Sequence, residues 1–535
     1  AVGSGAADAA TTAADLVAIG VDALGNTKTG GYCTAVGYAA GRASISPHNT
    51  FIGNSAGHAV GDAQHVVAIG KEALGGATFN NATCDYNNDP TITHDADANI
   101  VVGLVVTGTG IPAGAKVDSI TDSTHFELSA STTGGAVTNG TLTFHTNQGD
   151  QNIAIGSYTL GAATTGNSNI AIGHYALTAN TTGYTNVAVG HLALKTNTTG
   201  FRSTAIGAHA LEAQSPASTA VDMGNTAVGF YAGTSVTTGS ANTIVGSLAG
   251  DALNTAGGNT VVGFAALSGD IKGDTTTAVG AYALTAQSFS SATNAYNTAI
   301  GYQTGMGLTT GTQNTIVGSL ACSAGGAFDG SNNVVLGSNA ALNATDMNHS
   351  IVIGTNANNI GVNAGANNVL LGHAAGQDIA GGASNILIGR DAGLNISAGN
   401  DNIAIGHGAM DAADTSAARH SCIAIGSNAL GGQTAAVSDC VAIGLNALAA
   451  QNANVKNTVI GGLAGVTVAG GTENTFLGYM SGNAVSAGNS NTALGHTAYL
   501  AGTGTANTVV GGDACRGAMS GADNTVMGHA AGMAL

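Results

Sequence analysis

The sequence predicts an all-β fold: a parallel β-solenoid of about 27 coils, each of ~17 residues, interrupted once by a small antiparallel β domain. Three observations predict it. A 17-residue repeat is clearest at 152–202, as NIAIGSYTLGAATTGNS, NIAIGHYALTANTTGYT and NVAVGHLALKTNTTGFR. One glycine, the anchor glycine, recurs 26 times from Gly20 to Gly528, and 16 of its 25 intervals are 17 residues. A single interval, Gly70 to Gly156, is 86 residues long and must hold an insertion.

These intervals define three segments. Residues 1–76 and 150–535 are predicted to form solenoid coils, and residues 77–149 to form the inserted domain. Stacked coils ~4.8 Å apart predict a rod of roughly 130 Å.

Each repeat contains one short strand that ends at the anchor glycine. Positions are counted from this glycine. Position −3 is threonine, valine or isoleucine in every repeat, and position −1 is isoleucine, valine, leucine or methionine. The two positions share one side of the strand because side chains alternate. The glycine then allows the chain to turn a corner.

Position −2 faces the other way and is mostly alanine, with larger apolar residues such as Phe51, Leu387 and Phe476 in some coils. A strand that is apolar on both sides is usually covered on both sides. We therefore expect the −2 face to be covered by another copy of the chain. The alternative is that a small alanine is tolerated on an exposed face.

Position −4 is asparagine in 18 of the 26 repeats. Stacking would place these side chains in a ladder of amide hydrogen bonds that holds the register of the coils and carries no chemistry. The residues that define this ladder are Asn152, Asn169, Asn186, Asn474 and Asn491.

Two cysteines replace the ladder asparagine in adjacent coils, Cys422 and Cys440. Their Cα atoms are expected about 5 Å apart, which is within reach of a disulfide. Two free thiols in the ladder are the alternative.

The insertion alternates apolar and polar residues in short runs separated by glycine, proline and asparagine, which is an antiparallel β pattern. Its HDADAN segment places Asp95, Asp97 and Asn99 at the spacing that opens a calcium loop. The EF-hand pattern then requires glycine and a later glutamate, where this chain has Ile100 and Val106. A looser calcium site is the functional alternative to a solvated acidic turn.

Other chemistry is sparse. His174 and His191 follow the anchor glycine in adjacent coils and could stack, with metal binding as the functional alternative to an exposed polar column. No set of nucleophile, base and orienting residue stands out, and the glycines open no phosphate-binding helix. We expect a protein that is not an enzyme.

The composition argues against two classes of protein, those that bind nucleic acid and those that span a membrane. Only 7% of residues are charged and the net charge is −18, which argues against nucleic-acid binding. No apolar run is long enough to span a membrane.

The core NTAIG, as at 225–229, 297–301 and 491–495 (NTALG in the last and NTAVG in the first), resembles the head repeats of trimeric autotransporter adhesins and repeats of phage tail fibres. The string VTGTGIPAGAKVDSITDSTHFELS resembles small β modules of virion structural proteins. The first resemblance implies a left-handed β-roll, a homotrimer and surface attachment. The chain departs from the adhesins because its repeat is longer and because it shows no coiled-coil heptads and no barrel strands.

We therefore expect a structural or adhesive fibre at an extracellular or virion surface, a homo-oligomer that could bind a host receptor or glycan. The chain begins within a strand and ends within a repeat, without the polar caps of solenoids. This suggests the alternative of a filament subunit that joins end to end. An ice-binding solenoid is a third hypothesis, and the replacement of threonine by valine or isoleucine at −3 in nearly half of the coils counts against it.

Overall fold

The structure is a computed structural model of residues 1–535. It describes all of them except 28–30, 62, 76–77, 98–99, 101, 103, 113–114, 146–148, 163–164, 217, 219–220, 324–326, 361–364, 412–418, 433–435, 451–455 and 534–535. The fold is the predicted all-β parallel solenoid, with about 27 turns of ~17 residues. The described residues contain no helix that could cross a lipid bilayer.

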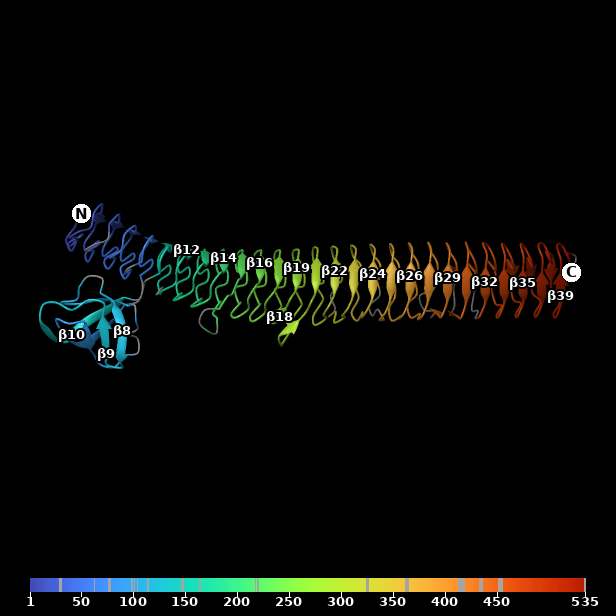
Figure 1. The fold of residues 1–535 in the computed structure, drawn as a ribbon. Helices are drawn as coiled ribbons and strands as arrows, with labels where there is room; N and C mark the ends of the chain where they lie inside the picture. Colours follow the sequence, from blue (N-terminus) through green and yellow to red (C-terminus); the bar gives the residue numbers. More distant parts are fainter. Residues whose placement is uncertain are drawn as a thin grey trace. The chain divides into compact units, whose positions relative to one another are not determined.

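The chain divides into two units, Ala1–Lys272 and Gly273–Leu535. In the first unit each solenoid strand pairs in parallel with the strand of the next coil (Figure 1). These strands are β1 (Val17–Ile19), β2 (Thr34–Val36), β3 (Thr50–Ile52), β4 (Val67–Ile69), β11 (Ile153–Ile155), β12 (Ile170–Ile172), β13 (Val187–Val189), β14 (Thr204–Ile206), β15 (Thr226–Val228), β16 (Thr243–Val245) and β17 (Thr260–Val262).

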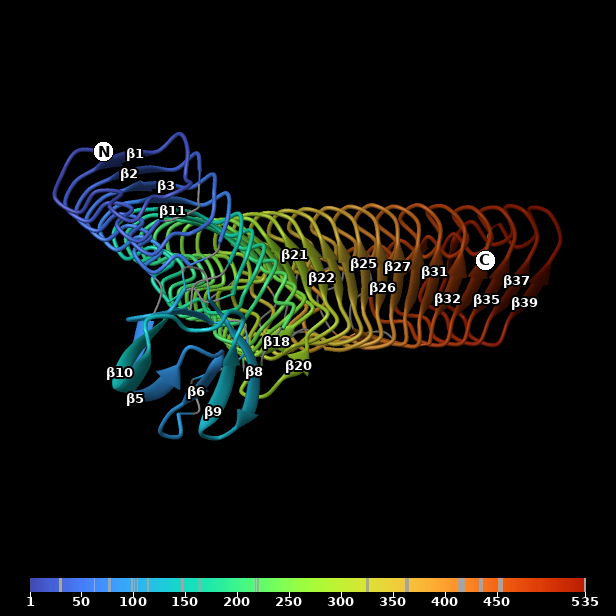
Figure 2. The ribbon, with the colours of Figure 1, turned by 60° about the vertical axis from the view of Figure 1, so that its left-hand side comes forward.

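The second unit repeats the arrangement, and Figure 2 shows its coils as loops that lie one behind another. Its solenoid strands are β19 (Thr277–Val279), β21 (Thr298–Ile300), β22 (Thr315–Val317), β23 (Val334–Leu336), β24 (Ile351–Ile353), β25 (Val369–Leu371), β26 (Ile386–Ile388), β27 (Ile403–Ile405), β29 (Ile423–Ile425), β31 (Val441–Ile443), β32 (Thr458–Ile460), β33 (Thr475–Leu477), β35 (Thr492–Leu494), β37 (Thr508–Val510) and β39 (Thr525–Met527).

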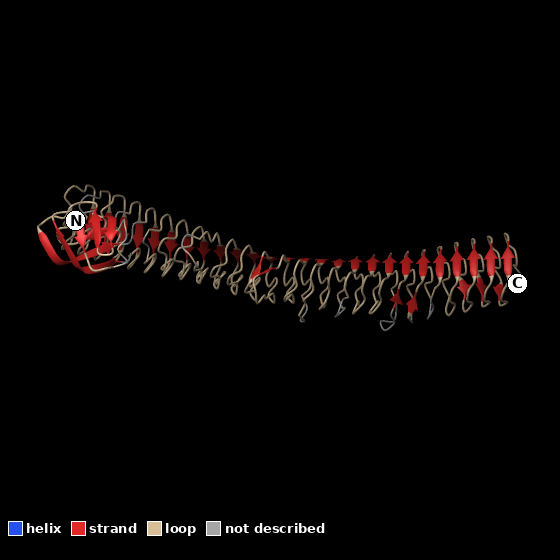
Figure 3. Cartoon of the chain, turned by 60° about the horizontal axis from the view of Figure 1, so that its bottom comes forward, coloured by secondary structure: helices blue, strands red, loops and turns tan. Residues whose placement is uncertain are grey.

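A few coils of the second unit form a second, two-residue strand away from this row, as Figure 3 shows near the C-terminus. β18 (Gly273–Asp274) pairs with β20 (Thr293–Asn294), and β28 (Arg419–His420) with β30 (Val437–Ser438). β34 (Ala484–Val485), β36 (Ala501–Gly502) and β38 (Ala518–Met519) form a three-stranded parallel patch.

The insertion leaves the stack without breaking it, because β4 pairs directly with β11, Ala68 opposite Ala154. Its strands are β5 (Thr78–Asn87), β6 (Thr91–Thr93), β7 (Val105–Thr107), β8 (Val117–Asp122), β9 (His125–Leu128) and β10 (Ala136–His145). They form an antiparallel sheet in the order β7-β10-β5-β6-β9-β8 around a core that includes Ile92, Phe126 and Phe144.

The anchor glycine is required by close packing between coils. Gly173 has φ +134°, and a Cβ atom there would lie 2.4 Å from the carbonyl oxygen of Gly190 in the next coil. Neither this backbone angle nor this space admits a side chain.

The orientation of the strands corrects our expectation for position −2. The −2 residues are buried inside the coil, as Ala18, Phe51 and Leu387 illustrate, and the −3 and −1 residues face outward. The −2 alanines are therefore covered by the chain's own coil. The side in need of a cover is the one formed by −3 and −1.

Candidate functional site

The outward side of the solenoid strands forms one continuous surface in each unit, which we call the strand face: the side chains at positions −3 and −1. Every one of these residues is threonine, valine, isoleucine, leucine or methionine, and none carries a charge. Many are exposed although they are large and apolar, for example Ile19 at 45% and Leu371 at 42%. A contiguous apolar patch of this kind is typical of an interaction surface.

The asparagine column joins neighbouring coils by a fixed pattern of hydrogen bonds. The backbone N–H of Asn169 donates to Oδ1 of Asn152 at 2.9 Å, and Asn186 repeats the bond to Asn169 at 3.0 Å. Each amide nitrogen donates to a carbonyl of the next coil, as Asn474 Nδ2 does to Gly488 at 2.8 Å. Asn491 continues the column with its N–H 2.9 Å from Asn474 Oδ1. All five ladder asparagines are buried.

Cys422 and Cys440 are both buried free thiols, so the structure contains no disulfide between them. Their sulfur atoms lie near carbonyl oxygens, Cys422 Sγ 3.3 Å from His420 and Cys440 Sγ 3.4 Å from Ser438. The hydrogen bond with Cys440 and burial both raise the pKa of the Cys422 thiol. Both cysteines thus take the place of the ladder asparagine as buried packing residues.

Aromatic or imidazole rings occupy position +1 or +2 in five successive coils of the first unit, from Tyr158 to Tyr231. His174 and His191 are nearly parallel, with ring centroids 5.5 Å apart and planes 4° apart. Tyr158 and Tyr175 are parallel at 5.0 Å. The described residues contain no group of three or more His, Cys, Asp or Glu side chains arranged to hold a metal ion.

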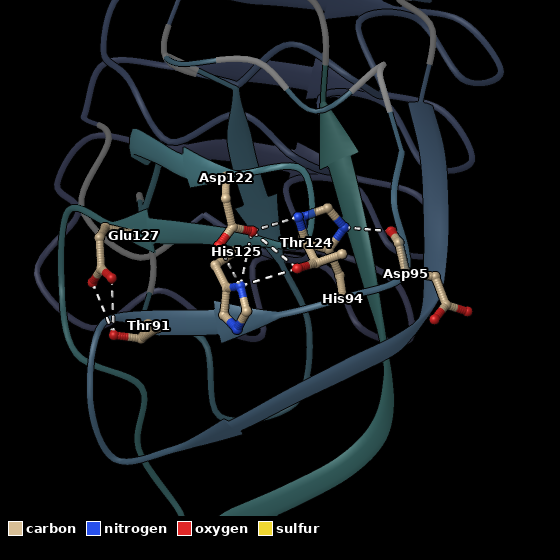
Figure 4. A network of polar contacts seen from close by, with 7 residues as sticks. All are labelled: Thr91, His94, Asp95, Asp122, Thr124, His125 and Glu127. Atoms are coloured by element: carbon tan, nitrogen blue, oxygen red, sulfur yellow. Dashed lines mark hydrogen bonds and ion pairs between the residues drawn. The ribbon is translucent and has the colours of Figure 1, made fainter.

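The inserted domain holds the polar network of Figure 4. Asp122 accepts hydrogen bonds from His125 Nδ1 at 2.9 Å and from the N–H of Thr124 at 2.7 Å. These bonds, that from His125 first, lower the pKa of Asp122 to about 2. Glu127 accepts from the Thr91 hydroxyl at 2.9 Å.

Of the three residues of the predicted calcium site, the structure describes two, Asp95 and Asp97. The side chain of Asp95 is exposed. Asp95 joins this network through its backbone carbonyl oxygen, which lies 2.5 Å from His94 Nδ1. Asp97 lines a cleft of about 320 Å³ together with His94 and Asp122. Asn99 lies outside the described residues.

Sequence reasoning missed Asp122 and His125. They flank the turn between β8 and β9, and the D-S-T-H string is their only sequence signal. Their approach to His94 depends on the pairing of β9 with β6, which local pattern does not specify.

The fold and the strand face together define the protein as a β-solenoid repeat protein, a class compatible with structural and fibre proteins. Comparison of the chain with protein-family models, with curated proteins and with solved structures finds no match.

Proposed function

We propose that this chain is a non-enzymatic structural and adhesive fibre protein of a virion or other extracellular surface, in which three copies pack through their strand faces. The observation that carries the proposal is the exposed, uncharged strand face. Covering it removes apolar surface from water, at roughly 25 cal/mol per Å². The number three rests on the resemblance to the adhesin heads.

The area of the strand face is close to the area that one partner contributes to a standard protein interface. The strands of the second unit, β19 to β39 along the solenoid row, number fifteen. At ~4.8 Å per strand and a width of ~10 Å they offer roughly 700 Å² per copy. A standard protein interface takes ~800 Å² from each partner.

Introducing charge into the strand face tests the proposal. Leu371→Glu and Ile386→Glu place carboxylates on adjacent strands, β25 and β26, at exposed positions. We expect sedimentation velocity to show the double variant as a monomer. Ser338→Glu is the matched control, because Ser338 is exposed but lies at +1, off the strand face. If the double variant keeps the mass of the wild type, the copies do not associate through this face.

Ice binding is a second candidate, favoured by the outward orientation of position −3. Five successive strands, β32, β33, β35, β37 and β39, each begin with an outward threonine and pair in register. Such a row gives regularly spaced hydroxyl and methyl groups. Thermal hysteresis of the purified protein would support this function, and Thr492→Tyr should then reduce it. A solution of the protein that freezes without thermal hysteresis would exclude ice binding.

A further inference from the structure

Two adjacent coils of the second unit carry cysteine in place of the ladder asparagine. Four successive coils have Asn402, Cys422, Cys440 and Asn457 at position −4. Asn402 Oδ1 accepts the N–H of Cys422 at 3.1 Å, as the ladder requires. The sulfur of cysteine is only a weak hydrogen-bond acceptor, so it replaces poorly the amide oxygen that holds the next coil. Two successive steps of the ladder are therefore weakened at this point.

The paired strands hold the two cysteines opposite each other. β29 and β31 are parallel neighbours in which Ile423 lies opposite Val441. The residues that precede these two, Cys422 and Cys440, are therefore opposite as well. The N–H of Ile423 donates to the carbonyl oxygen of Cys440 at 2.8 Å, which fixes this alignment. Neighbouring strands lie ~4.8 Å apart, and disulfides join Cα atoms that are about 4.4–6.8 Å apart. The strand pairing thus provides a spacing that a disulfide accepts.

The two sulfur atoms lie together in the interior of the solenoid. Both side chains are buried, Cys422 with 1% and Cys440 with 0% of its surface exposed. Cys422 Sγ lies 3.7 Å from the carbonyl oxygen of Val437, a residue of the coil that carries Cys440. The side chain of Cys422 therefore reaches toward that coil. A hydrogen bond between the two thiols is the main cause of the raised pKa of Cys422.

The other cysteines, all of which the structure describes, lack such a neighbour. Cys33 also occupies position −4 and is buried, but the adjacent coils carry Leu16 and Asn49 at that position. The remaining cysteines lie in the inserted domain or in coils without a cysteine neighbour, namely Cys84, Cys322 and Cys515. Oxidation should therefore select the pair at 422 and 440.

We propose that Cys422 and Cys440 form a redox modification site, at which a low-molecular-weight disulfide such as oxidised glutathione converts the two thiols into a disulfide between adjacent coils. One protein thiolate attacks a sulfur of oxidised glutathione, and one glutathione leaves as its thiolate. The other protein thiolate attacks the protein sulfur of this mixed disulfide and expels the second glutathione. The pair gives up two protons to solvent and two electrons to glutathione.

The disulfide supplies a covalent link where the asparagine ladder is interrupted. It ties β29 to β31 and should slow their separation, and reduction should reverse this effect. The amide of Ile423 reports on it directly, because this amide bonds to Cys440 across the two strands. The inference takes from the proposed function only the oxidising surroundings of an extracellular or virion surface, in which disulfides persist.

Equilibration of the full chain with glutathione tests this inference. The reduced native chain and a chain refolded in oxidised glutathione are held in the same, mostly oxidised glutathione buffer until neither mass changes. Burial of the thiols then limits only the rate. After alkylation and digestion, we expect a peptide linking Cys422 to Cys440 that is about tenfold more abundant than any other disulfide. Hydrogen exchange of the Ile423 amide should be about tenfold slower in the oxidised chain than in the reduced chain.

Two variants are matched controls. Cys33→Ser removes a buried cysteine from the same column and should leave the link in place. Cys422→Ser should abolish the link, and Cys440 should then be recovered as an alkylated thiol. The link and the exchange rate are measured first in the wild type, so a variant that fails to fold does not decide the outcome.

Three results would overturn the inference. These are alkylation of all six cysteines from both starting states, glutathione bound at Cys422 or Cys440 in place of the link, or equal exchange of the Ile423 amide in oxidised and reduced chains. The mass by light scattering is measured in parallel. A trimer without the link refutes the redox site alone, and a monomer with the link refutes the proposed fibre alone.

Discussion

At the scale of single residues, the ladder asparagine makes bonds that no apolar residue can replace. Asn474 Oδ1 accepts the N–H of Asn491 at 2.9 Å, and its Nδ2 donates to the Gly488 carbonyl at 2.8 Å. Asn474→Ala removes the side chain that makes both bonds and leaves the Asn491 N–H and the Gly488 carbonyl unsatisfied in a buried column. We expect a loss of about 1–3 kcal/mol, measured as faster hydrogen exchange of the Asn491 amide and a lower melting temperature.

Serine provides the control for that change. Ser350 occupies the same column, and its hydroxyl accepts the N–H of Asn368 at 3.1 Å. Asn474→Ser should therefore restore the protection of the Asn491 amide in part. Protection that is equal in wild type and in Asn474→Ala would show that the side chain does not hold the coils together.

Buried thiols make the stability depend on alkaline pH. Burial raises the pKa of Cys322 from 9.0 to about 12. Between these values the unfolded chain has lost the thiol proton and the folded chain keeps it, so the free energy of unfolding falls as pH rises. Denaturant titrations from pH 9 to 11 measure this. The free energy of unfolding of Cys322→Ala should fall less steeply with pH than that of the wild type, by up to about 1.4 kcal/mol per pH unit. Equal slopes would mean that the thiol ionises in the folded coil.

At the scale of the coil, the inward residues at −2 and +4 share one small core. Coils with alanine at −2 can carry leucine at +4, as Ala171 and Leu177 do. Where −2 is large, +4 can be glycine: a Cβ atom at Gly482 would lie 2.3 Å from the Phe476 ring. The two positions compensate for each other in size.

An exchange of sizes within one coil tests this compensation. Phe476→Ala alone should cost about 3–5 kcal/mol through the cavity it leaves. Gly482→Leu alone should clash with the Phe476 ring. The double variant should recover most of the loss, because leucine already occupies +4 with φ +52° at Leu177, close to the +61° of Gly482. Additive losses in a double-mutant cycle of chemical denaturation would refute a shared core.

The same core explains what the sequence could and could not predict. The period, the strand that ends at each anchor glycine and the existence of an antiparallel insertion follow from local pattern. The direction of −2 does not, because alternation cannot distinguish inside from outside when both sides of a strand are apolar. The decisive signal was the size relation between Phe476 and Gly482, which is visible in the repeat once the two positions are known to meet.

The surfaces were predictable to different degrees. The adjacency of His174 and His191 follows from the 17-residue spacing, since both follow an anchor glycine. The 68° angle between the ring planes of His174 and Tyr175 is set where the backbone of Tyr175 is left-handed, a conformation that tyrosine does not signal. The approach of Asp97 and Asp122 depends on strand pairing within the insertion.

At the scale of the whole molecule, the central claim is that the strand face is an interface between copies. Solenoid stability is a sum of contacts between neighbouring coils, and those contacts leave the strand face uncovered in each unit. A single chain would keep large apolar residues such as Ile386 and Leu494 in water.

The most direct test is the absolute mass of the purified chain by multi-angle light scattering over a range of concentrations. The chain is 51.4 kDa, so three copies weigh 3 × 51.4, about 154 kDa. We expect that mass, independent of concentration in the micromolar range. A stable mass of 51.4 kDa would contradict the account, because it would mean that the strand face remains exposed to solvent.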